Sequence, residues 1–486
     1  MEQSLKEKTI KGVGWSAADA FLGHGMTFLV GIVLARLLTP EEYGLIGIVT
    51  IFTSVLLGVV DCGFSNALIR KMNVTNEDYC TLFFVNLLIS LLMYMVLYIC
   101  APLIAVFFER PQLINLARVT GLLLIIQAIS IVQNTILSRR LDFKTKTKAS
   151  FFSAASSGMV GILLAFLGYG VWSIVAQLLS RQIVYSTCLW LYNRWWPKLL
   201  ISYQSLKYMW GFGWKLLISG LLNRIWGELY QTVVGKCYSP AMLGQYTRSK
   251  QYATIFSTNI TSIVQNVSYP VLSQVQDNKQ RMVGAYRRVI KTTMFVTAIC
   301  MIFIGAVSEP LIYCLIGPQW HVAATFLPFI CLSLSFHPLH AINLNMLQVQ
   351  NRTDIYLYLE IIKKVVAIGP LCLGIFVDIY WMLLGSVFAG IVHFFLNSYY
   401  TGKELGYSSL EQLKDVAPSY GIAIVIAISV FFLKYLPISY WIIMPIQIIV
   451  GASVFYLICE KAKLQEYEEL KNIAKRGVAR VLKRDI

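Results

Sequence analysis

The stretch ARLLTPEEYG (Ala35–Gly44) returns two hundred residues later as GKCYSPAMLG (Gly235–Gly244). Each copy holds a basic residue, a hydroxyl side chain directly before a proline, and a glycine four residues after that proline. Proline suits a turn or the first position of a helix, and glycine relieves a tight corner. A turn that is repeated at a fixed offset indicates an internal duplication, in which the same corner joins two helices in each copy.

Further matches keep nearly the same offset. GVGW at 12–15 returns as GFGW at 211–214, and GVWSIV near Trp172 corresponds to IYWMLL near Trp381. Over residues 35–69 the offset of 200 needs no gap. One match between glycine-tryptophan pairs is a weak signal, but four matches in order favour a duplicated chain.

The composition predicts a protein that crosses a membrane several times. The chain has 486 residues, of which 57% are hydrophobic and 13% are charged, and its mean hydropathy is +0.65. Soluble domains carry about 25% charged residues. A span needs about 20 mostly apolar residues, and by this rule about fourteen segments qualify, at residues 12–34, 44–66, 80–106, 115–137, 150–168, 171–192, 210–234, 251–275, 292–314, 325–347, 357–377, 380–400, 416–434 and 440–459.

The repeat sets the expected architecture. Six spans per copy is an even number, so both copies start on the same side of the membrane and form a parallel repeat. We expect an all-α protein whose two six-helix lobes enclose a central cavity. The domains would be two lobes, two added helices and a basic tail, at residues 1–209, 210–415, 416–459 and 460–486.

Basic residues predict the orientation. With the N-terminus in the cytoplasm, 31 of the 41 lysines and arginines lie in cytoplasmic loops and tails, and six lie in outer loops. Both termini are therefore expected to be cytoplasmic. The net charge of +17 follows this topology rather than indicating a nucleic-acid partner. The basic tail is interpreted as an amphipathic helix on anionic lipid, with docking of a partner protein as the alternative.

Charged residues inside spans are costly and usually face a bundle interior or water. Arg224 and Glu228 lie one helical turn apart; the alternative is a structural intrahelical pair. Asp61 alternatively caps or braces a helix. His24 adds a titratable group to the first span. Lys215, Arg118 and Arg181 each lie within reach of a span end. The alternative for these three residues is that the charged group extends to the membrane surface.

A polar stripe follows the eighth span. Its members recur at alternating intervals of four and three residues, which places them on one helix face. We interpret the stripe as lining water, although polar packing between helices is the alternative. The stripe includes Thr254, Thr258, Thr261 and Gln265.

The sequence lacks the motifs of several enzyme classes. It contains no GxxxxGK[ST], HExxH or GxSxG pattern, and the expected outer loops are too short to hold a glycan polymerase or ligase. The ten cysteines are scattered without a CxxC pair. HPLH (His337–His340) has no carboxylate or cysteine beside it in the sequence, so packing or a pore-lining role is favoured over a metal site. We expect no enzyme activity, no metal and no cofactor.

Three motifs resemble a known family. LARLLTPEEYGLIGIV, DCGFSNALIRK (Asp61–Lys71) and IGPQW (Ile316–Trp320) resemble polysaccharide transporters, the Wzx-type flippases of the multidrug/oligosaccharidyl-lipid/polysaccharide exporter superfamily. The resemblance covers essentially the whole chain. It implies that the chain moves an undecaprenyl-diphosphate-linked oligosaccharide across the bacterial inner membrane for surface polysaccharide or lipopolysaccharide assembly, with other assembly proteins as possible partners.

The resemblance also implies roles for the residues above. Arg224, Lys215 and His24 would supply cations to the diphosphate, and the Thr254–Gln265 stripe would contact glycan hydroxyls. Glu228 and Asp61 would couple transport to a proton or sodium gradient, because a buried carboxylate can exchange a proton. The alternatives are a cation-coupled multidrug antiporter of the same superfamily and a membrane glycan polymerase or ligase.

Overall fold

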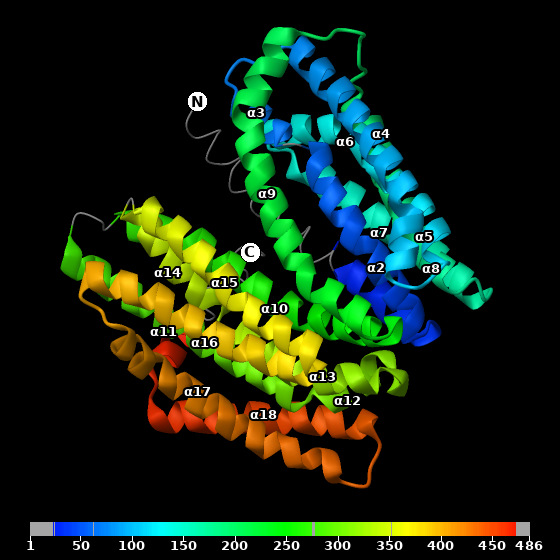
Figure 1. Ribbon diagram of the computed structural model, residues 1–486. Helices are drawn as coiled ribbons and strands as arrows, with labels where there is room; N and C mark the ends of the chain where they lie inside the picture. The colour runs from blue at the N-terminus through cyan, green and yellow to red at the C-terminus, as the bar shows by residue number, and fades with distance from the viewer. Residues whose placement is uncertain (1–22, 24, 62, 275–277, 351, 473–486) are drawn as a thin grey trace, which may run out of the picture. The chain divides into compact units, whose positions relative to one another are not determined.

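The computed structural model describes residues 23, 25–61, 63–274, 278–350 and 352–472 (Figure 1). All regular elements among these residues are helices, as predicted. They are α2 (Pro40–Asp61), α3 (Phe64–Arg70), α4 (Asn76–Phe107), α5 (Leu113–Thr120), α6 (Leu122–Arg139), α7 (Phe143–Phe166), α8 (Val171–Asn193), α9 (Tyr203–Cys237), α10 (Pro240–Gln274), α11 (Lys279–Ala306), α12 (Ser308–Ile316), η1 (Pro318–Trp320), α13 (His321–Ser335), α14 (His337–Val349), α15 (Thr353–Phe376), α16 (Ile379–Leu405), α17 (Ser409–Phe431), η2 (Phe432–Tyr435) and α18 (Tyr440–Ala462).

The protein is a multi-pass membrane protein. Within the described residues, nine helical stretches are long and apolar enough to cross a membrane, and a shorter apolar helix covers Gly25–Leu37. Four more of the expected spans correspond to helices that are not among the nine: α8, α9, α10 and α15. The number fourteen therefore stays a prediction.

The chain forms two compact units, Met1–Gly244 and Gln245–Ile486. In the first unit α9 packs along α2, and α4 packs against α2 and α6 (Figure 1). Because α9 belongs to this unit by its contacts, the packing boundary lies after residue 244, whereas the predicted repeat boundary lies after residue 209. The two compact units are defined by contacts between residues, whereas the two lobes are defined by the repeat in the sequence. The contacts therefore do not test the two six-helix lobes, which stay a prediction.

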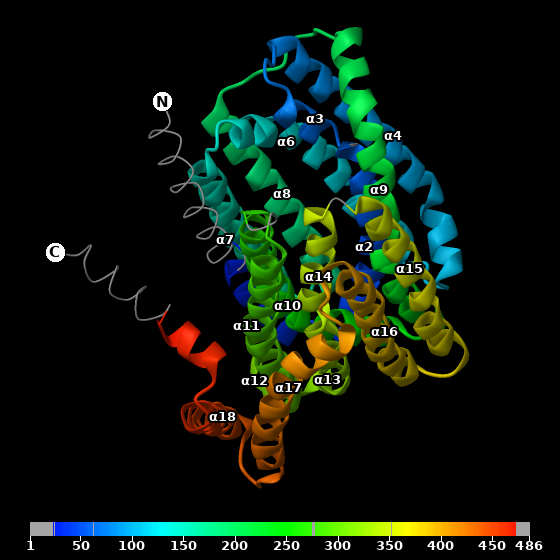
Figure 2. The same cartoon turned by 90° about the vertical axis from the view of Figure 1, so that its left-hand side faces the viewer.

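The second unit has a core of aliphatic and aromatic side chains from α10, α11, α14, α16 and α17. Tyr286 and Tyr407 pack edge to face at its centre, with ring centroids 6.0 Å apart. In Figure 2 α15 and α16 run side by side, and α11 lies beside α17. This packing of α14, α15 and α16 brings together polar residues that are far apart in the sequence.

The two matched turns meet each other inside the first unit. A Cβ atom on Gly44 would lie 1.7 Å from the carbonyl oxygen of Pro240, and one on Gly244 would lie 1.9 Å from the carbonyl oxygen of Pro40. No side chain fits at such distances, so glycine is required at both crossing points. The sequence predicted two equivalent tight corners; the structure adds that each corner forms the contact surface of the other.

The expected span over 44–66 is divided. α2 ends at Asp61, and Gly63 has φ 70°, a left-handed conformation that favours glycine. The short helix α3 then starts at Phe64. A Cβ on Gly63 would also lie 2.9 Å from the Cβ of Leu216 on α9, so this break lets the two segments approach closely.

Candidate functional site

Arg224 and Glu228 both contact one residue of α2. The Nη1 atom of Arg224 donates a hydrogen bond to the Ser54 carbonyl oxygen (3.0 Å), and the Ser54 hydroxyl donates to Glu228 Oε1 (3.1 Å). Gln231 Nε2 donates to the other carboxylate oxygen at 2.6 Å. The ion pairs found among the described residues do not include Arg224 with Glu228. The two charged groups therefore join α9 to α2 rather than to each other.

Arg224 lines a polar pocket of about 430 Å³ in the first unit. Its walls come from α2, α3, α6 and α9, and they include Asp61 and Asn134. Gly58 faces the arginine: a Cβ there would lie 2.7 Å from Arg224 Cδ, so glycine leaves room for the side chain. The side-chain oxygen of Asn134 is buried and has no hydrogen-bond partner among the described residues. The pocket thus offers a cation, a carboxylate and a free amide oxygen.

Asp61 accepts a hydrogen bond from the Ser65 hydroxyl, which lies one turn away on α3. This contact crosses the break at Gly63 and therefore braces the junction of α2 and α3. At the same time Asp61 lines the polar pocket with Arg224. The sequence placed both residues on separate spans and gave no reason to pair them; the packing of α9 on α2 brings them to one pocket.

Glu228 lines a different pocket, with a volume of about 620 Å³. Its walls are aliphatic and aromatic side chains of α2, α4 and α9, and Glu228 is the one ionisable carboxylate among them. One turn of α9 thus separates a cation in a polar pocket from a carboxylate in an apolar pocket. The neighbouring Thr232 hydroxyl bonds to the backbone carbonyl of Glu228 at 3.0 Å.

Other predicted residues have different environments. Lys215 is exposed on α9, and its ammonium lies 5.9 Å from the centre of the Trp214 ring. It is absent from the lining of the polar pocket, although Leu216 and Leu217 contribute to it. His24 lies outside the described residues.

The threonine side chains of the stripe on α10 differ in how exposed they are. Thr258 is exposed and Thr261 is 5% exposed. The hydroxyls of Thr254, Thr258 and Thr261 each bond to a carbonyl one turn back on their own helix, at 2.6 to 2.8 Å. Such bonds satisfy the hydroxyl donor locally but leave its oxygen as an acceptor. The side chain of Gln265 lies outside the described residues, and the role of the stripe in binding stays a prediction.

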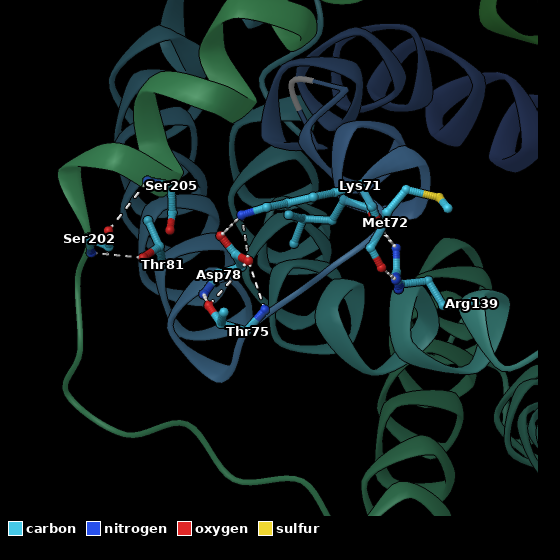
Figure 3. A network of polar contacts seen from close by, with 9 residues as sticks. Lys71, Met72, Thr75, Asp78, Thr81, Arg139, Ser202 and Ser205 are labelled. Atoms are coloured by element: carbon cyan, nitrogen blue, oxygen red, sulfur yellow. Dashed lines mark hydrogen bonds and ion pairs between the residues drawn. The ribbon is translucent and has the colours of Figure 1, made fainter.

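The DCGFSNALIRK motif ends in a buried ion pair. Lys71 Nζ lies 2.8 Å from both carboxylate oxygens of Asp78, whose side chain is 1% exposed (Figure 3). Asp78 also accepts a hydrogen bond from the amide of Thr75, with which it forms the capping box of α4. Arg139 of α6 donates to the carbonyls of Leu68 and Lys71, as Figure 3 shows in part. The motif therefore fixes the turn between α3 and α4.

The IGPQW motif also has a structural role. Gly317 has φ 99°, and Trp320 is fully buried in the second unit. The side chain of Gln245 makes two hydrogen bonds there. Its amide nitrogen donates to the Gln319 carbonyl (2.7 Å), and its oxygen accepts from the Ala323 amide (2.8 Å). This tryptophan turn is tied to the start of α10.

The tail begins with ion pairs to two other segments. Glu469 pairs with Arg288 of α11 at 2.7 Å, and Lys471 pairs with Glu460 of α18 at 2.6 Å. Residues 473–486 lie outside the described part of the chain, so its interaction with lipid stays a prediction. Across the described residues, histidine, cysteine and carboxylate side chains do not gather in threes as a metal site would require.

Comparisons with known proteins agree with this architecture. Residues 33–325 match the family model described as polysaccharide biosynthesis protein. The chain is 27% identical over 334 residues to the succinoglycan biosynthesis transport protein ExoT of Rhizobium meliloti (strain 1021), with 68% of each chain covered.

Two solved structures share the fold. The lipid II flippase MurJ, in an inward closed conformation, matches with a TM-score of 0.73 at 16% identity, covering 94% of this chain and 99% of that one. An inward-facing multidrug resistance transporter of the MATE family matches with a TM-score of 0.61 at 17% identity, covering 81% and 98%. These three proteins are transporters or flippases rather than enzymes, in agreement with the expectation from the sequence.

Proposed function

The chain belongs to the polysaccharide biosynthesis protein family, and from this premise we propose that it is a flippase for lipid-linked oligosaccharides. Its substrate would be an undecaprenyl-diphosphate-linked glycan, which moves from the inner to the outer leaflet of the bacterial cytoplasmic membrane for surface polysaccharide assembly. Both chain termini would lie in the cytoplasm, because this orientation places most basic residues there.

The polar pocket around Arg224 carries the proposal. A diphosphate needs a cationic donor, and a guanidinium binds phosphate oxygens in a planar, two-pronged geometry. The free oxygen of Asn134 and the carboxylate of Asp61 are acceptors suited to sugar hydroxyls. A pocket of about 430 Å³ falls within the range of small-molecule sites and would hold the phosphates and the first sugar rather than a whole glycan.

Ion coupling is the second part of the proposal. Glu228 is the one carboxylate in the lining of the apolar pocket, and it accepts hydrogen bonds from the Ser54 hydroxyl and the Gln231 amide. Its hydrogen bond with Ser54 links it to the same α2 residue that holds Arg224. Protonation of Glu228 would change this shared contact and so transmit the ion gradient to the phosphate-binding group. Asp61, in the pocket itself, would be a further coupling carboxylate, with H⁺ or Na⁺ as the ion.

A second candidate function rests on one observation. A single carboxylate in an apolar pocket of about 620 Å³ is also the arrangement that a lipophilic drug cation would need. A cation-coupled multidrug antiporter would bind its cargo at Glu228. The guanidinium of Arg224 one turn away would repel such a cation, which favours the anionic substrate.

Deletion of the gene followed by mass spectrometry of the membrane lipids tests the proposal. A flippase deletion accumulates undecaprenyl-diphosphate-linked glycan inside the cell and loses surface glycan, and the mass identifies the sugars. Unchanged lipid-linked glycan together with an increased sensitivity to lipophilic cations would replace the flippase assignment with the antiporter. Complementation with the wild-type chain is the control.

A further inference from the structure

Two histidines of the second unit, His340 and His393, lie side by side and close to a lysine–glutamate pair. His340 lies on α14 and His393 on α16, while Lys363 and Glu360 on α15 form an ion pair. The sequence shows no carboxylate near HPLH; the packing of α14 against α15 and α16 supplies one. A role limited to packing would not require this concentration of titratable groups inside a helix bundle.

The two central rings are adjacent and each has an open nitrogen. The ring centroids of His340 and His393 are 6.0 Å apart, with an interplanar angle of 68°. His393 Nε2 lies 3.1 Å from the Lys363 carbonyl oxygen, and since a carbonyl can only accept, this nitrogen carries a hydrogen and donates. In the neutral ring its Nδ1 is then a free acceptor. His340 Nδ1 is buried and has no partner among the described residues.

The surroundings leave the imidazoles, those of the pair and that of His337, as the groups whose charge can change. Lys363 and Glu360 neutralise each other. α13 contains no charged side chain apart from His321 at its first position. The phenols on the other packed helices are bonded to neutral partners and stay protonated near pH 7. The ionisable groups that act on the pair are His337 on α14 and Lys363 and Glu360 on α15. Of the phenols, Tyr286 on α11 bonds Asn343 and Tyr420 on α17 bonds Ser335.

We propose that His340 and His393 form a proton-binding site that couples a proton gradient to the transport cycle. An enclosed imidazole is favoured in its neutral form, whereas one exposed to water takes up a proton near pH 6.5. A conformational cycle that alternately encloses and hydrates the pair would load a proton on one side of the membrane and release it on the other. A proton held by the pair passes from one imidazole to the other, either directly or through one bridging water. Hard cations prefer oxygen ligands, so this site selects H⁺ over Na⁺.

Proton binding is tested without any substrate. The full chain is labelled with ¹⁵N-histidine, placed in liposomes of phosphatidylethanolamine and phosphatidylglycerol, and titrated by NMR. Two charges 6.0 Å apart repel each other enough to separate the two proton uptake steps of the pair by about two pH units. For the His340–His393 pair we expect two proton-uptake steps in the wild type. In His340→Gln and in His393→Gln the remaining ring of the pair should show one step. A titration of either ring that is unchanged by substitution of the other would overturn the site.

Coupling is tested in the same liposomes with undecaprenyl diphosphate that carries one fluorescent sugar. The inference rests on the proposed flippase function, and the readout is the increase in flipping rate on imposing a pH gradient. We expect His340→Gln and His393→Gln to flip at the basal rate but to lose this increase, while His321→Gln, outside the cluster, keeps it. A pH-stimulated double variant would refute the coupling role. Absence of flipping by the wild type would count against the proposed function, and the NMR titration would still decide the proton site.

Discussion

Ser54 is the residue through which the candidate site is organised. It is a half-buried serine on α2 whose carbonyl holds Arg224 and whose hydroxyl holds Glu228. The sequence identified the two charged residues from their cost inside a span, which is a property of each residue alone. It did not identify Ser54, Gly58 or Asn134 as partners, because small and neutral residues are common in spans and carry no such signal.

Replacing Arg224 by alanine should lower the flipping rate about 10- to 100-fold, which corresponds to the loss of one or two charge-assisted hydrogen bonds to phosphate. The rate is measured with the fluorescent undecaprenyl diphosphate probe in proteoliposomes. Arg118→Ala is the matched control, because that guanidinium packs on the Tyr98 ring (4.0 Å) outside the pocket and should leave the rate within about twofold. Wild-type surface glycan in an Arg224→Ala, Lys215→Ala double variant would contradict the role of the pocket.

Glu228→Gln should keep basal flipping but lose its response to an ion gradient, because an amide has nearly the same shape but cannot exchange a proton. The measurement compares flipping with and without a gradient in proteoliposomes. Glu109→Gln is the control: Glu109 is an exposed carboxylate whose pKa is lowered by its hydrogen bond with Lys236, and it lies outside both pockets. Equal stimulation in wild type and Glu228→Gln would remove Glu228 from the coupling mechanism.

At the scale of helices, the repeated turn is explained by a reciprocal contact. Gly44 and Gly244 each face the carbonyl of the other turn's proline. The repeat could be read from the sequence because both copies preserve the same residue pattern. That the copies touch could not, because spacing along a chain carries no information about which equivalent corners meet.

Gly44→Ala should destabilise the fold by about 3 kcal/mol, the upper end for an overpacked core, because its Cβ would overlap the Pro240 carbonyl. The measurement is the unfolding free energy in detergent. Gly211→Ala on α9 is the control, since its Cβ meets nothing within 4 Å and alanine favours a helix by up to about 1 kcal/mol. In the Gly44→Ala variant the two turns are already forced apart, so adding Gly244→Ala should lower the unfolding free energy by less than Gly244→Ala does alone. Full additivity would argue that the two glycines act independently.

Lys71→Met should cost about 3 kcal/mol of unfolding free energy, because it leaves the buried carboxylate of Asp78 without its cation. Lys236→Met is the comparison: its exposed partner Glu109 can be hydrated, so the melting temperature should hardly move. The test is thermal unfolding of both variants in the same detergent. Equal melting temperatures would show that the ion pair does not stabilise the turn between α3 and α4.

At the scale of the whole molecule, the sequence makes a topological prediction that labelling can check. On a cysteine-free background, Ser439→Cys lies in an expected outer loop and Lys198→Cys in an expected cytoplasmic loop. We expect a membrane-impermeant maleimide to label the first in intact cells and the second only after the membrane is opened. The reverse pattern would invert the orientation.

The sequence by itself determined the membrane class, the helical architecture and the internal repeat, because mean hydropathy, helix length and residue spacing are properties of the linear chain. Only the tertiary structure decided which polar residues share a pocket. It placed Arg224 and Glu228 in two different pockets, brought Asp61 and Asn134 to the first, and joined His340 to His393 through the packing of α14 on α16. A hydrophobic pattern specifies that a helix can cross the bilayer, whereas the side chains opposite it depend on helix packing, which no local stretch of sequence encodes.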